Sequence, residues 1–518
     1  MTATRLAASM LLFLGALLGA HASHAATLHV AQGALHGTRS KGVDAYLGVP
    51  YAAPPVGASR WRMPAPAPAW KGVRAATRFG ASCQQEISGG FGPWSSEYQV
   101  SGKVSEDCLY LNVWRPSRPQ TGKLPIMVWI HGGGFSSGSG AVPIYDGAAV
   151  AAKGVIFVNI NYRVGMFGFL AHPALSQEGI GSGNYGLGDI VAALKWVRDN
   201  AAALGGDPEQ ITLAGQSAGS MAIHDLMVSP AAKGLFARVI SESGPGMGRP
   251  PEPLKQAEDV GVRLAEAAGV TSIEQLRALP AQKLVDAEKR LGPAAGMLRF
   301  APVIDGGFIP IDPYGSAAGT YLDTPILAGM NADEAFSLPV DTQEKLQSDI
   351  DQLFGPMAAM ARGVYRVDQP GDIKDLNRLI RRERGLASSW AWARQRVATS
   401  QHPIFMYLFN HVEPGSGPWR SFHTSEVPYA LATLDRSPGR AFAANDTALS
   451  AQMSSYWINF VKHGDPNGGG LPKWQAYRDS APSMMVIGTD SHMAPMLTPE
   501  KRAFYQGVIE GDVQLTLF

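Results

Sequence analysis

The sequence predicts an α/β protein in which helices flank a mostly parallel central sheet. Several short apolar runs lack polar alternation, which is typical of strands buried on both faces. Segments with apolar residues at helical spacing separate these runs, as in parallel β–α–β units. The 518 residues are 45% hydrophobic and 17% charged, so the chain can bury a core of the size that such a sheet needs.

The predicted elements follow one another from residue 124 onward. The predicted strands cover residues 125–130, 155–160, 211–214, 237–240 and 325–329. Apolar spacing predicts helices over 190–198, before a Gly-Gly-Asp-Pro break, and over 220–226. Two further stretches, near 252–291 and 343–399, are predicted to be mainly helical insertions. We therefore expect residues 26–518 to form a single domain with insertions.

The first 25 residues have the pattern of a secretory signal peptide. Arg5 precedes an apolar stretch over residues 7–20, and small residues follow up to Ala25. The apolar stretch is shorter than the ~20 residues that a membrane-spanning helix needs, so an uncleaved anchor is the weaker alternative. We expect cleavage after Ala25, no stable membrane anchor, and a secreted or periplasmic mature protein.

The chain has two cysteines, Cys83 and Cys108, and both lie in the predicted mature chain. An even number of cysteines in an exported protein favours a disulfide. Closing a loop of this length would stabilise the fold by roughly 3–4 kcal/mol on the chain-entropy estimate. Two separate buried thiols are the alternative.

Charge and residue pattern exclude several classes of function. The chain has 44 Lys and Arg against 43 Asp and Glu, a formal net charge of +1. It has no basic run, so nucleic acid is not an expected partner. No Cys/His cluster has metal-ligand spacing, and we expect neither a metal nor an organic cofactor. The oligomeric state stays open.

A G-x-S-x-G motif at residues 215–219 (GQSAG) provides a candidate nucleophile, Ser217. It lies between the predicted strand 211–214 and the predicted helix 220–226, and this context makes a short motif more specific. The tight turn would expose the Ser217 hydroxyl above the sheet, at the positive end of the helix. A serine hydroxyl needs a base to take its proton and donors to stabilise the resulting oxyanion.

A glycine-rich segment, residues 131–135 (HGGGF), directly follows the strand predicted at 125–130. Its glycines allow backbone N–H groups to converge on one point without side chains in the way. The amides of Gly133, Gly134 and Ala218 are therefore candidate donors of an oxyanion hole. An ordinary glycine-rich turn is the alternative interpretation.

These motifs resemble those of the type B carboxylesterase family, which includes the cholinesterases. Residues 106–113 (EDCLYLNV) match the second signature of that family, and residues 204–219 resemble the first signature around the serine. Other similar segments, in the family's order, lie at 131–135, 161–165 and 459–467, and the likeness runs from about residue 48 to residue 474. The resemblance implies an α/β-hydrolase fold and a secreted, bacterial-type serine hydrolase that acts on small carboxylic esters with water.

The resemblance also implies a catalytic acid and a base. The family's acid lies in a G-x-N-x-x-E stretch, here residues 329–334, which gives Glu334. Without the family, Glu334 and its neighbour Asp333 are equal candidates. In the implied mechanism, the acid orients the base and stabilises the imidazolium that forms.

The implied base is His423, in the segment 422–429 (FHTSEVPY). His411 and His463 are also C-terminal, and the residues alone exclude neither of them. The order nucleophile, acid and base along the chain agrees with that of α/β-hydrolases.

Further features are implied by the same resemblance. Ser243 corresponds to a serine beside the acid, with an ordinary strand-end serine as the alternative. The remaining correspondences are structural: a disulfide between Cys83 and Cys108, and internal ion pairs between Arg60 and Glu106 and between Arg163 and Asp189.

The sequence departs from the family beside the nucleophile. The family usually has Glu before the serine, and here Gln216 stands there. The missing negative charge is expected to weaken any preference for cationic substrates. Leu204 replaces the Phe that usually opens the first signature, which is a tolerated apolar exchange.

Two other functions remain as alternatives. An amidase or a lipase-like hydrolase can have the same fold, because a related group of hydrolases also carries an HGGG loop. That group is shorter and usually has Asp as its acid. A non-catalytic, adhesion-type binding protein is the second alternative, but such proteins typically lack the nucleophile that Ser217 provides here. The acyl and alcohol parts of the ester stay undetermined.

Overall fold

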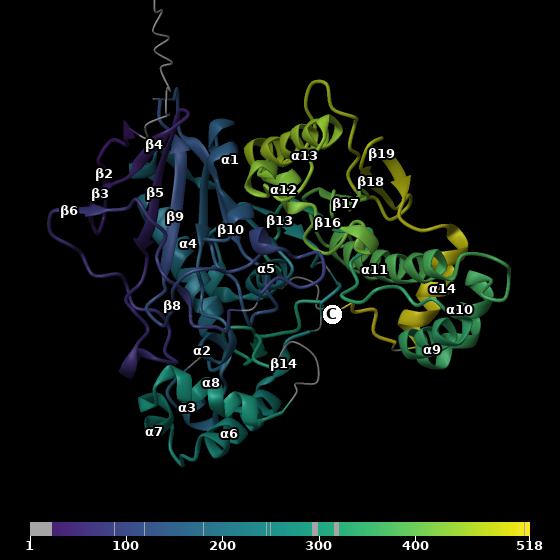
Figure 1. Cartoon of the computed structure of the whole chain (residues 1–518), viewed down its shortest axis with the longest axis horizontal. Helices are drawn as coiled ribbons and strands as arrows, with labels where there is room; N and C mark the ends of the chain where they lie inside the picture. Colours follow the sequence, from purple (N-terminus) through teal and green to yellow (C-terminus); the bar gives the residue numbers. More distant parts are fainter. Residues whose placement is uncertain are drawn as a thin grey trace, which may run out of the picture.

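The computed structural model describes residues 23–87, 89–118, 120–179, 181–244, 246–248, 250–292, 299–314, 321–511 and 513–517. Residues 1–22, most of the predicted signal peptide, lie outside the described residues. Within the described ranges, a 12-stranded sheet forms the centre of the molecule and helices pack against it (Figure 1). This is the α/β architecture that the sequence predicts.

The sheet is parallel at its centre and antiparallel at both edges, in the strand order β1-β4-β5-β9-β11-β10-β12-β13-β16-β17-β18-β19. The parallel strands are β10 (Leu124–Ile130), β11 (Ile156–Ile160), β12 (Gly206–Gln216), β13 (Arg238–Glu242), β16 (Ile326–Asn331), β17 (Ile404–Phe409) and β18 (Ser483–Ile487). The antiparallel edge strands are β1 (Ser23–His24), β4 (Thr38–Ser40), β5 (Val43–Pro50), β9 (Tyr110–Pro116) and β19 (His492–Pro495). Smaller sheets contain β2 (Leu28–Val30), β3 (Gly33–His36), β6 (Val73–Ala75), β7 (Ser82–Cys83), β8 (Val104–Ser105), β14 (Glu252–Pro253) and β15 (Val303–Ile304).

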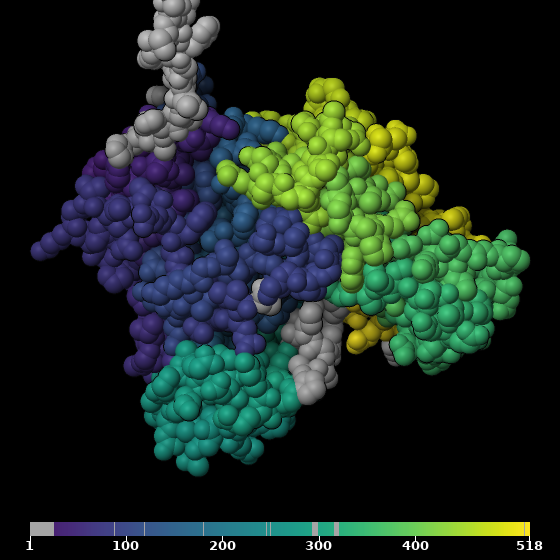
Figure 2. All heavy atoms as spheres, viewed as in Figure 1, coloured from purple at the N-terminus to yellow at the C-terminus, as the bar shows by residue number. Residues whose placement is uncertain are grey.

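The helices are numbered in chain order. The first half of the chain contains α1 (Ala148–Ala152), α2 (Gly165–Phe169), α3 (Pro173–Gln177), α4 (Tyr185–Leu204), α5 (Ala218–Val228), α6 (Leu254–Ala268), α7 (Ile273–Ala278) and α8 (Ala281–Arg290). The second half contains α9 (Gln343–Phe354), α10 (Ala358–Tyr365), α11 (Ile373–Val397), α12 (Val427–Ala430), α13 (Ala444–His463) and α14 (Pro499–Glu510). Figures 1 and 2 show α6, α7 and α8 together at the bottom, while α9 and α10 lie at the right beside α14.

Strand β10 shows why apolar runs form the centre of the sheet. Ile126, Val128 and Ile130 belong to the core that includes α4 and α5, whereas Met127 and Trp129 belong to the core that includes α1 and α13. All five side chains are buried. Because side chains alternate along a strand, a strand with helices on both faces needs apolar residues at every position.

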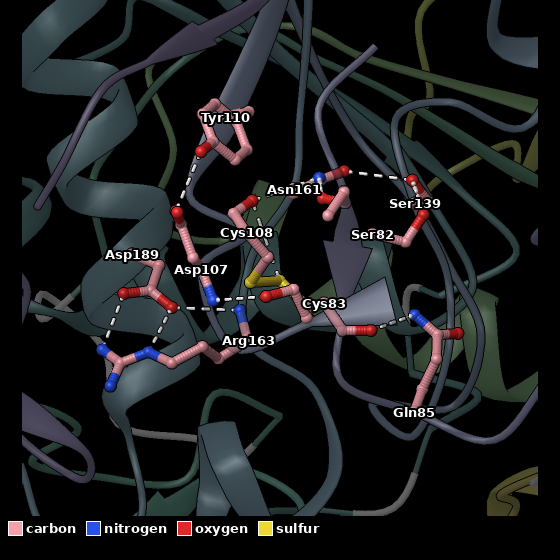
Figure 3. The surroundings of a disulfide bond; sticks show 12 residues. Ser82, Cys83, Gln85, Asp107, Cys108, Tyr110, Ser139, Asn161, Arg163 and Asp189 are labelled. Atoms are coloured by element: carbon pink, nitrogen blue, oxygen red, sulfur yellow. Dashed lines mark hydrogen bonds and ion pairs between the residues drawn. A yellow bond between two sulfur atoms is a disulfide. The ribbon is translucent and has the colours of Figure 1, made fainter. Parts of the chain in front are cut away.

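The predicted disulfide and both predicted ion pairs are present, and Figure 3 shows the disulfide with Arg163 and Asp189 near it. Cys83 and Cys108 are bonded, with their Cα atoms 4.9 Å apart. Arg163 makes a two-pronged contact with Asp189, at 2.7 and 2.8 Å, close to this disulfide. The second predicted pair is equally well formed, since Arg60 donates two hydrogen bonds of 2.6 Å to Glu106.

Among the described residues, no helix has the length and apolar composition needed to span a bilayer. The described residues of the segment between the two cysteines, 84–87 and 89–107, pack against the C-terminal half of the chain. Figure 2 shows residues near 100 against the yellow-green residues near 430, and Arg440 reaches Glu97 across this contact at 2.7 Å. The disulfide loop therefore lies over the carboxyl ends of the parallel strands.

Candidate active site

Ser217 lies in the turn between β12 and α5, as predicted. Its backbone has φ 57° and ψ −127°, a combination that a residue with a side chain rarely adopts. Its N–H donates to Glu242 O at 2.9 Å, and its carbonyl accepts from Met221 N–H at 2.9 Å. A Cβ at Gly219 would lie 2.2 Å from Ile130 O. Only glycine therefore allows the helix to begin so close to β10, and the turn holds Ser217 at the end of the strand.

The side chains of His423 and Glu334 meet beside this turn. His423 Nδ1 lies 2.5 Å from Glu334 Oε2, and both side chains are buried. Glu334 follows β16, and its Oε1 accepts hydrogen bonds from Asn331 N–H at 2.6 Å and from Ser243 Oγ at 2.7 Å. A carboxylate held in this way favours the imidazole tautomer with its proton on Nδ1, which leaves Nε2 available to accept a proton.

Three other residues that the sequence suggested lie elsewhere. The Asp333 carboxylate points away from His423, toward Arg378 and Arg382, at 3.8 and 3.9 Å. His411 is buried in a separate pair with Asp446, at 2.7 Å. His463 is exposed at the end of α13. The structure thus brings Glu334 and His423, but none of these alternatives, to the turn that carries Ser217.

The glycine-rich segment after β10 passes directly beside Ser217. A Cβ at Gly132 would lie 2.9 Å from Ser217 Cβ, and Gly133 and Gly134 have φ of 110° and 59°. These conformations favour glycine, and they carry the segment around the serine. Ala218 begins α5 directly after Ser217, and Gly133 and Gly134 line the same cavity as Ser217. His131 holds the segment from beneath, with Nδ1 2.8 Å from Gly132 O.

A second carboxylate, which the sequence analysis did not identify, lies behind Glu334. Ser243 Oγ lies 2.7 Å from Glu334 Oε1 and 3.2 Å from Glu426 Oε1. Asn331 Nδ2 donates to Glu426 Oε2 at 2.5 Å. One hydroxyl proton cannot serve two carboxylates at once, so the pair of contacts is satisfied when a protonated Glu426 donates to Ser243 Oγ. Burial, followed by the charge of Glu334, raises the pKa of Glu426 to about 7.

This arrangement predicts a pH-dependent contribution of Glu426 to stability. Between about pH 4.5 and pH 7, the folded state keeps a proton on Glu426 that the unfolded state releases, so the free energy of unfolding falls as pH rises. Glu426→Gln mimics the protonated side chain and removes this dependence. Relative to the variant, the wild type should lose on the order of 2–3 kcal/mol between these limits.

Urea unfolding at about pH 5 and about pH 8 measures this difference. Glu209→Gln, which changes an exposed carboxylate paired with Arg198, is the matched control and should show no comparable change. An equal stability difference between the wild type and Glu426→Gln at both pH values would contradict the protonated state of Glu426.

A cavity of about 290 Å³ contains Ser217 and His423. Its aromatic lining comprises Phe91, Trp94, Tyr98, Tyr145 and Phe336. Trp94 Nε1 donates to His423 O at 2.9 Å, and its ring lies 5.6 Å from that of Phe336. The sequence did not predict that these residues line the site, because Trp94 reaches His423 from a loop 329 positions earlier in the chain. No local motif marks such a contact.

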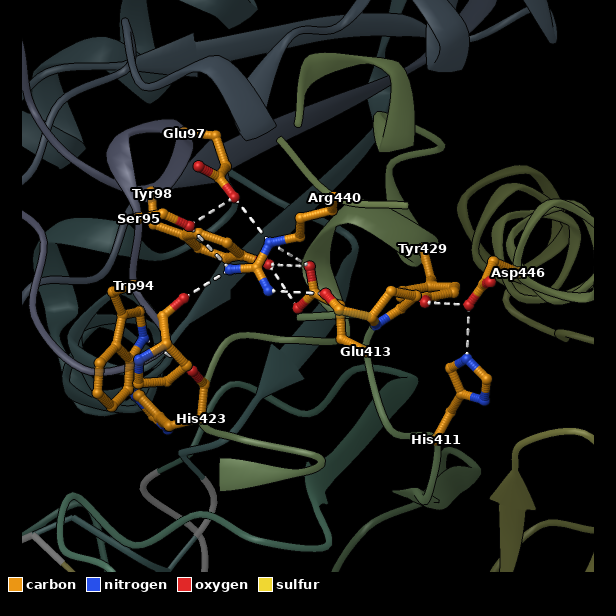
Figure 4. A network of polar contacts seen from close by, with 12 residues as sticks. Trp94, Ser95, Glu97, Tyr98, His411, Glu413, His423, Tyr429, Arg440 and Asp446 are labelled. Carbon is orange, nitrogen blue, oxygen red and sulfur yellow. Dashed lines mark hydrogen bonds and ion pairs between the residues drawn. The ribbon is translucent and has the colours of Figure 1, made fainter. Parts of the chain in front are cut away.

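Arg440 attaches this loop to the segment that carries His423 (Figure 4). Its Nε lies 2.7 Å from Glu97 and 3.0 Å from Glu413, and its guanidinium stacks on the ring of Tyr98 at 5.2 Å. Tyr98 in turn donates to Glu413 Oε2 at 2.8 Å. Burial raises the pKa of Glu413 to about 8, against the opposing effect of Arg440. This network holds the aromatic residues that line the cavity, called the aromatic wall below, in place relative to His423.

The fold and the site together define the class of protein. A mostly parallel sheet carries a strained serine turn after β12, a carboxylate after β16, and a histidine in the loop after β17. This is the arrangement of an α/β-hydrolase. In the described part of the chain, no group of three or more His, Cys, Asp or Glu side chains is placed to hold a metal ion.

Comparisons with known proteins identify the family. The model of the Carboxylesterase family matches residues 24–360 and 374–505. The chain is 37% identical to the fumonisin B1 esterase of Sphingopyxis macrogoltabida over 475 residues, 87% of this chain and 84% of that protein. It is 35% identical to the para-nitrobenzyl esterase of Bacillus subtilis over 490 residues, 91% of this chain and 96% of that protein. A solved PNB esterase superposes with a TM-score of 0.80 at 32% identity, covering 92% of this chain and 99% of that one.

The chain therefore belongs to the carboxylesterase family, as its motifs predict. It is an enzyme that hydrolyses carboxylic esters.

Proposed function

We propose that the enzyme works through an acyl-enzyme formed on Ser217. His423 Nε2 takes the proton of the Ser217 hydroxyl as Oγ attacks the ester carbonyl carbon, and it then gives that proton to the departing alcohol. A water molecule attacks the acyl-enzyme in the same way and releases the acid. Glu334 keeps the imidazole oriented and stabilises its positive form. The proton of Ser217 leaves with the alcohol, and a proton of the attacking water restores the Ser217 hydroxyl, so His423 is neutral again after each half-reaction and the cycle balances.

The oxyanion of each tetrahedral intermediate would be stabilised by the amides of Gly133, Gly134 and Ala218. They flank Ser217 on preformed backbone, so they need not reorganise as charge develops. The observation that carries the whole proposal is the 2.5 Å contact between His423 Nδ1 and Glu334 Oε2, at the edge of the cavity that contains Ser217.

Labelling with a fluorophosphonate tests this proposal, because the reagent phosphonylates an activated serine and releases fluoride. We expect one label per chain, located on the peptide that contains Ser217 by mass spectrometry, and loss of ester hydrolysis in proportion to labelling. Labelling of a different serine, or full activity after complete labelling of Ser217, would contradict the proposal. Rates of hydrolysis of an ester and of an amide with the same acyl group then distinguish esterase from amidase activity.

Gln216 is proposed to set the charge preference of the site. Its Nε2 lies 3.2 Å from His423 Nε2, so it contributes a neutral amide where the family usually has a carboxylate. At ~4–6 Å, a unit charge pair is worth a few kcal/mol with an effective dielectric constant near ~20. Gln216→Glu should therefore raise kcat/KM for a quaternary-ammonium ester, relative to its neutral isostere, by at least ~10-fold.

The wild type should hydrolyse the neutral ester at least as well as the cationic one, although the aromatic wall offers weaker cation–π attraction. Gln120→Glu is the control, since it adds the same charge at an exposed position that does not line the cavity, and it should leave the charge preference unchanged. A wild type that favours the cation tenfold or more would refute this role of Gln216.

We also propose that residues 26–518 form one catalytic domain and that the protein is exported. The signal-like composition of residues 1–25 supports export, as does the disulfide between Cys83 and Cys108. N-terminal sequencing of the mature protein tests the cleavage site, and a chain that does not begin at Ala26 would contradict it.

A further inference from the structure

The cavity that contains Ser217 and His423 is called the ester cavity below. A second cavity, of about 190 Å³, lies on the far side of the Glu334 segment from it. It is enclosed by residues 332–339, by α9 and α11, and by residues 516–517. Trp419 lines it, and the Trp419 ring lies 5.8 Å from that of Trp94, which lines the ester cavity. The two cavities are therefore neighbours, separated by an aromatic wall and by the chain that carries Glu334.

Four arginines from a single helix line this second cavity: Arg378, Arg381, Arg382 and Arg384. Arg381 is neutralised, because it makes a two-pronged contact with Asp349 at 3.1 and 2.6 Å. Arg384 is not neutralised in this way. Among the described residues, its hydrogen-bond acceptors are the main-chain oxygens of Gln514 and Thr516, and its Nε is buried without a partner.

Arg378 and Arg382 share one buried carboxylate at long range. Asp333 Oδ1 lies 3.8 Å from Arg378 and 3.9 Å from Arg382, beyond hydrogen-bond distance, and it has no hydrogen-bond partner of its own among the described residues. Arg378 also contacts Asp375, but that carboxylate is largely exposed to solvent. Four arginines and two carboxylates, Asp333 and Glu334, line the cavity, and the Glu334 oxygens are directed to Ser243 and His423. The lining therefore has more positive than negative charge, in a partly buried place where a charge is costly.

Apart from Glu334, Ser337 and Thr516, the remaining lining is apolar and includes Leu338, Leu353, Leu517, Pro339 and Pro418. Guanidinium groups bind carboxylates through paired hydrogen bonds, and aliphatic side chains favour a hydrocarbon body beside them. We propose that this cavity binds a small organic carboxylate, with its anionic group toward Arg378 and Arg382 and its apolar part toward the leucines. The acid released by ester hydrolysis belongs to this chemical class, but the site does not depend on the reaction at Ser217.

Calorimetric titration with benzoate, and with benzamide as its neutral isostere, tests this proposal on the full-length protein. Benzoate should bind saturably, and at least ~10-fold more tightly than benzamide, because only benzoate accepts charge-assisted hydrogen bonds from the arginines. Arg382→Gln should weaken benzoate binding by at least ~10-fold while leaving that of benzamide unchanged. Arg362→Gln is the matched control: it removes the same charge from a residue of α10 that pairs with Asp351 and does not line the cavity.

A second variant avoids any change of charge. Leu353→Trp fills the apolar end of the cavity, so it should reduce binding of benzoate while all four arginines remain. Equal affinities for benzoate and benzamide in the wild type, or benzoate binding that survives both Arg382→Gln and Leu353→Trp, would overturn the proposal. Fluorophosphonate labelling of Ser217 is read separately and should proceed equally in both variants, so failure of the carboxylate site is distinguishable from failure of the proposed catalytic mechanism.

Discussion

Ser217→Ala should abolish ester hydrolysis while leaving a folded protein. Loss of a nucleophilic serine from a triad of this type typically lowers kcat by on the order of 10⁶. The fold should tolerate the change, because the Ser217 side chain borders the ester cavity and the strained turn is held by main-chain bonds to Glu242 and Met221. Alanine retains the Cβ that already adopts this conformation.

The measurement is kcat on an aryl ester, together with circular dichroism and the thermal midpoint of the same preparation. Ser137→Ala is the matched control, since Ser137 lines the same cavity and its hydroxyl donates to Gly133 O at 3.2 Å. It should keep most of the activity. A Ser217→Ala protein with a tenth of wild-type kcat would rule out Ser217 as the nucleophile.

His423→Ala should be about as severe, again on the order of 10⁶ in kcat, because the serine is left without a base. The matched control is His411→Ala. His411 is also buried and also paired with a carboxylate, Asp446 at 2.7 Å, but it does not line the ester cavity.

Both variants lose a buried histidine–carboxylate pair, so both are expected to lose stability. Only His423→Ala should lose activity per folded molecule, and circular dichroism measures the folded fraction of each variant. His463→Ala, at an exposed position, should change neither quantity appreciably. Comparable losses of kcat in His411→Ala and His423→Ala would contradict the assignment of His423 as the base.

The central parallel strands could be predicted because they are buried on both faces. Residues 126–130 of β10 and, apart from Asn159, residues 156–160 of β11 belong to the two apolar cores, and this leaves a nearly continuous apolar run in the sequence. The antiparallel edge was missed, and so were the parallel strands β17 and β18, although β17 is a continuous buried run. Strand β9 ends in Trp-Arg-Pro and β5 contains Asp44 and Gly48, so neither strand shows such a run. Their pairing depends on residues far apart in the chain, and local pattern contains little information about it.

The candidate site divides in the same way. Ser217 and the glycines beside it are tied to a strand–turn–helix and to a loop after a strand, which are local structures with local motifs. Glu426 and Trp94 act on the site through contacts made only after folding. Glu426 stands three residues beyond His423, inside a segment that the sequence analysis singled out, yet its role appears only when Ser243 and Asn331 reach it.

The loop between Cys83 and Cys108 could be replaced by another loop without moving the rest of the chain. The Cα atoms of Cys83 and Cys108 lie 4.9 Å apart, so the chain leaves and rejoins the body of the protein at nearly one point. Between them it supplies Phe91, Trp94 and Tyr98 to the cavity, whereas Ser217, Glu334 and His423 lie in segments that follow strands of the sheet. A loop of different length and sequence, grafted between the same two cysteines, would give the cavity a new wall. Substrate preference can therefore diversify in this segment while the reacting groups stay as they are.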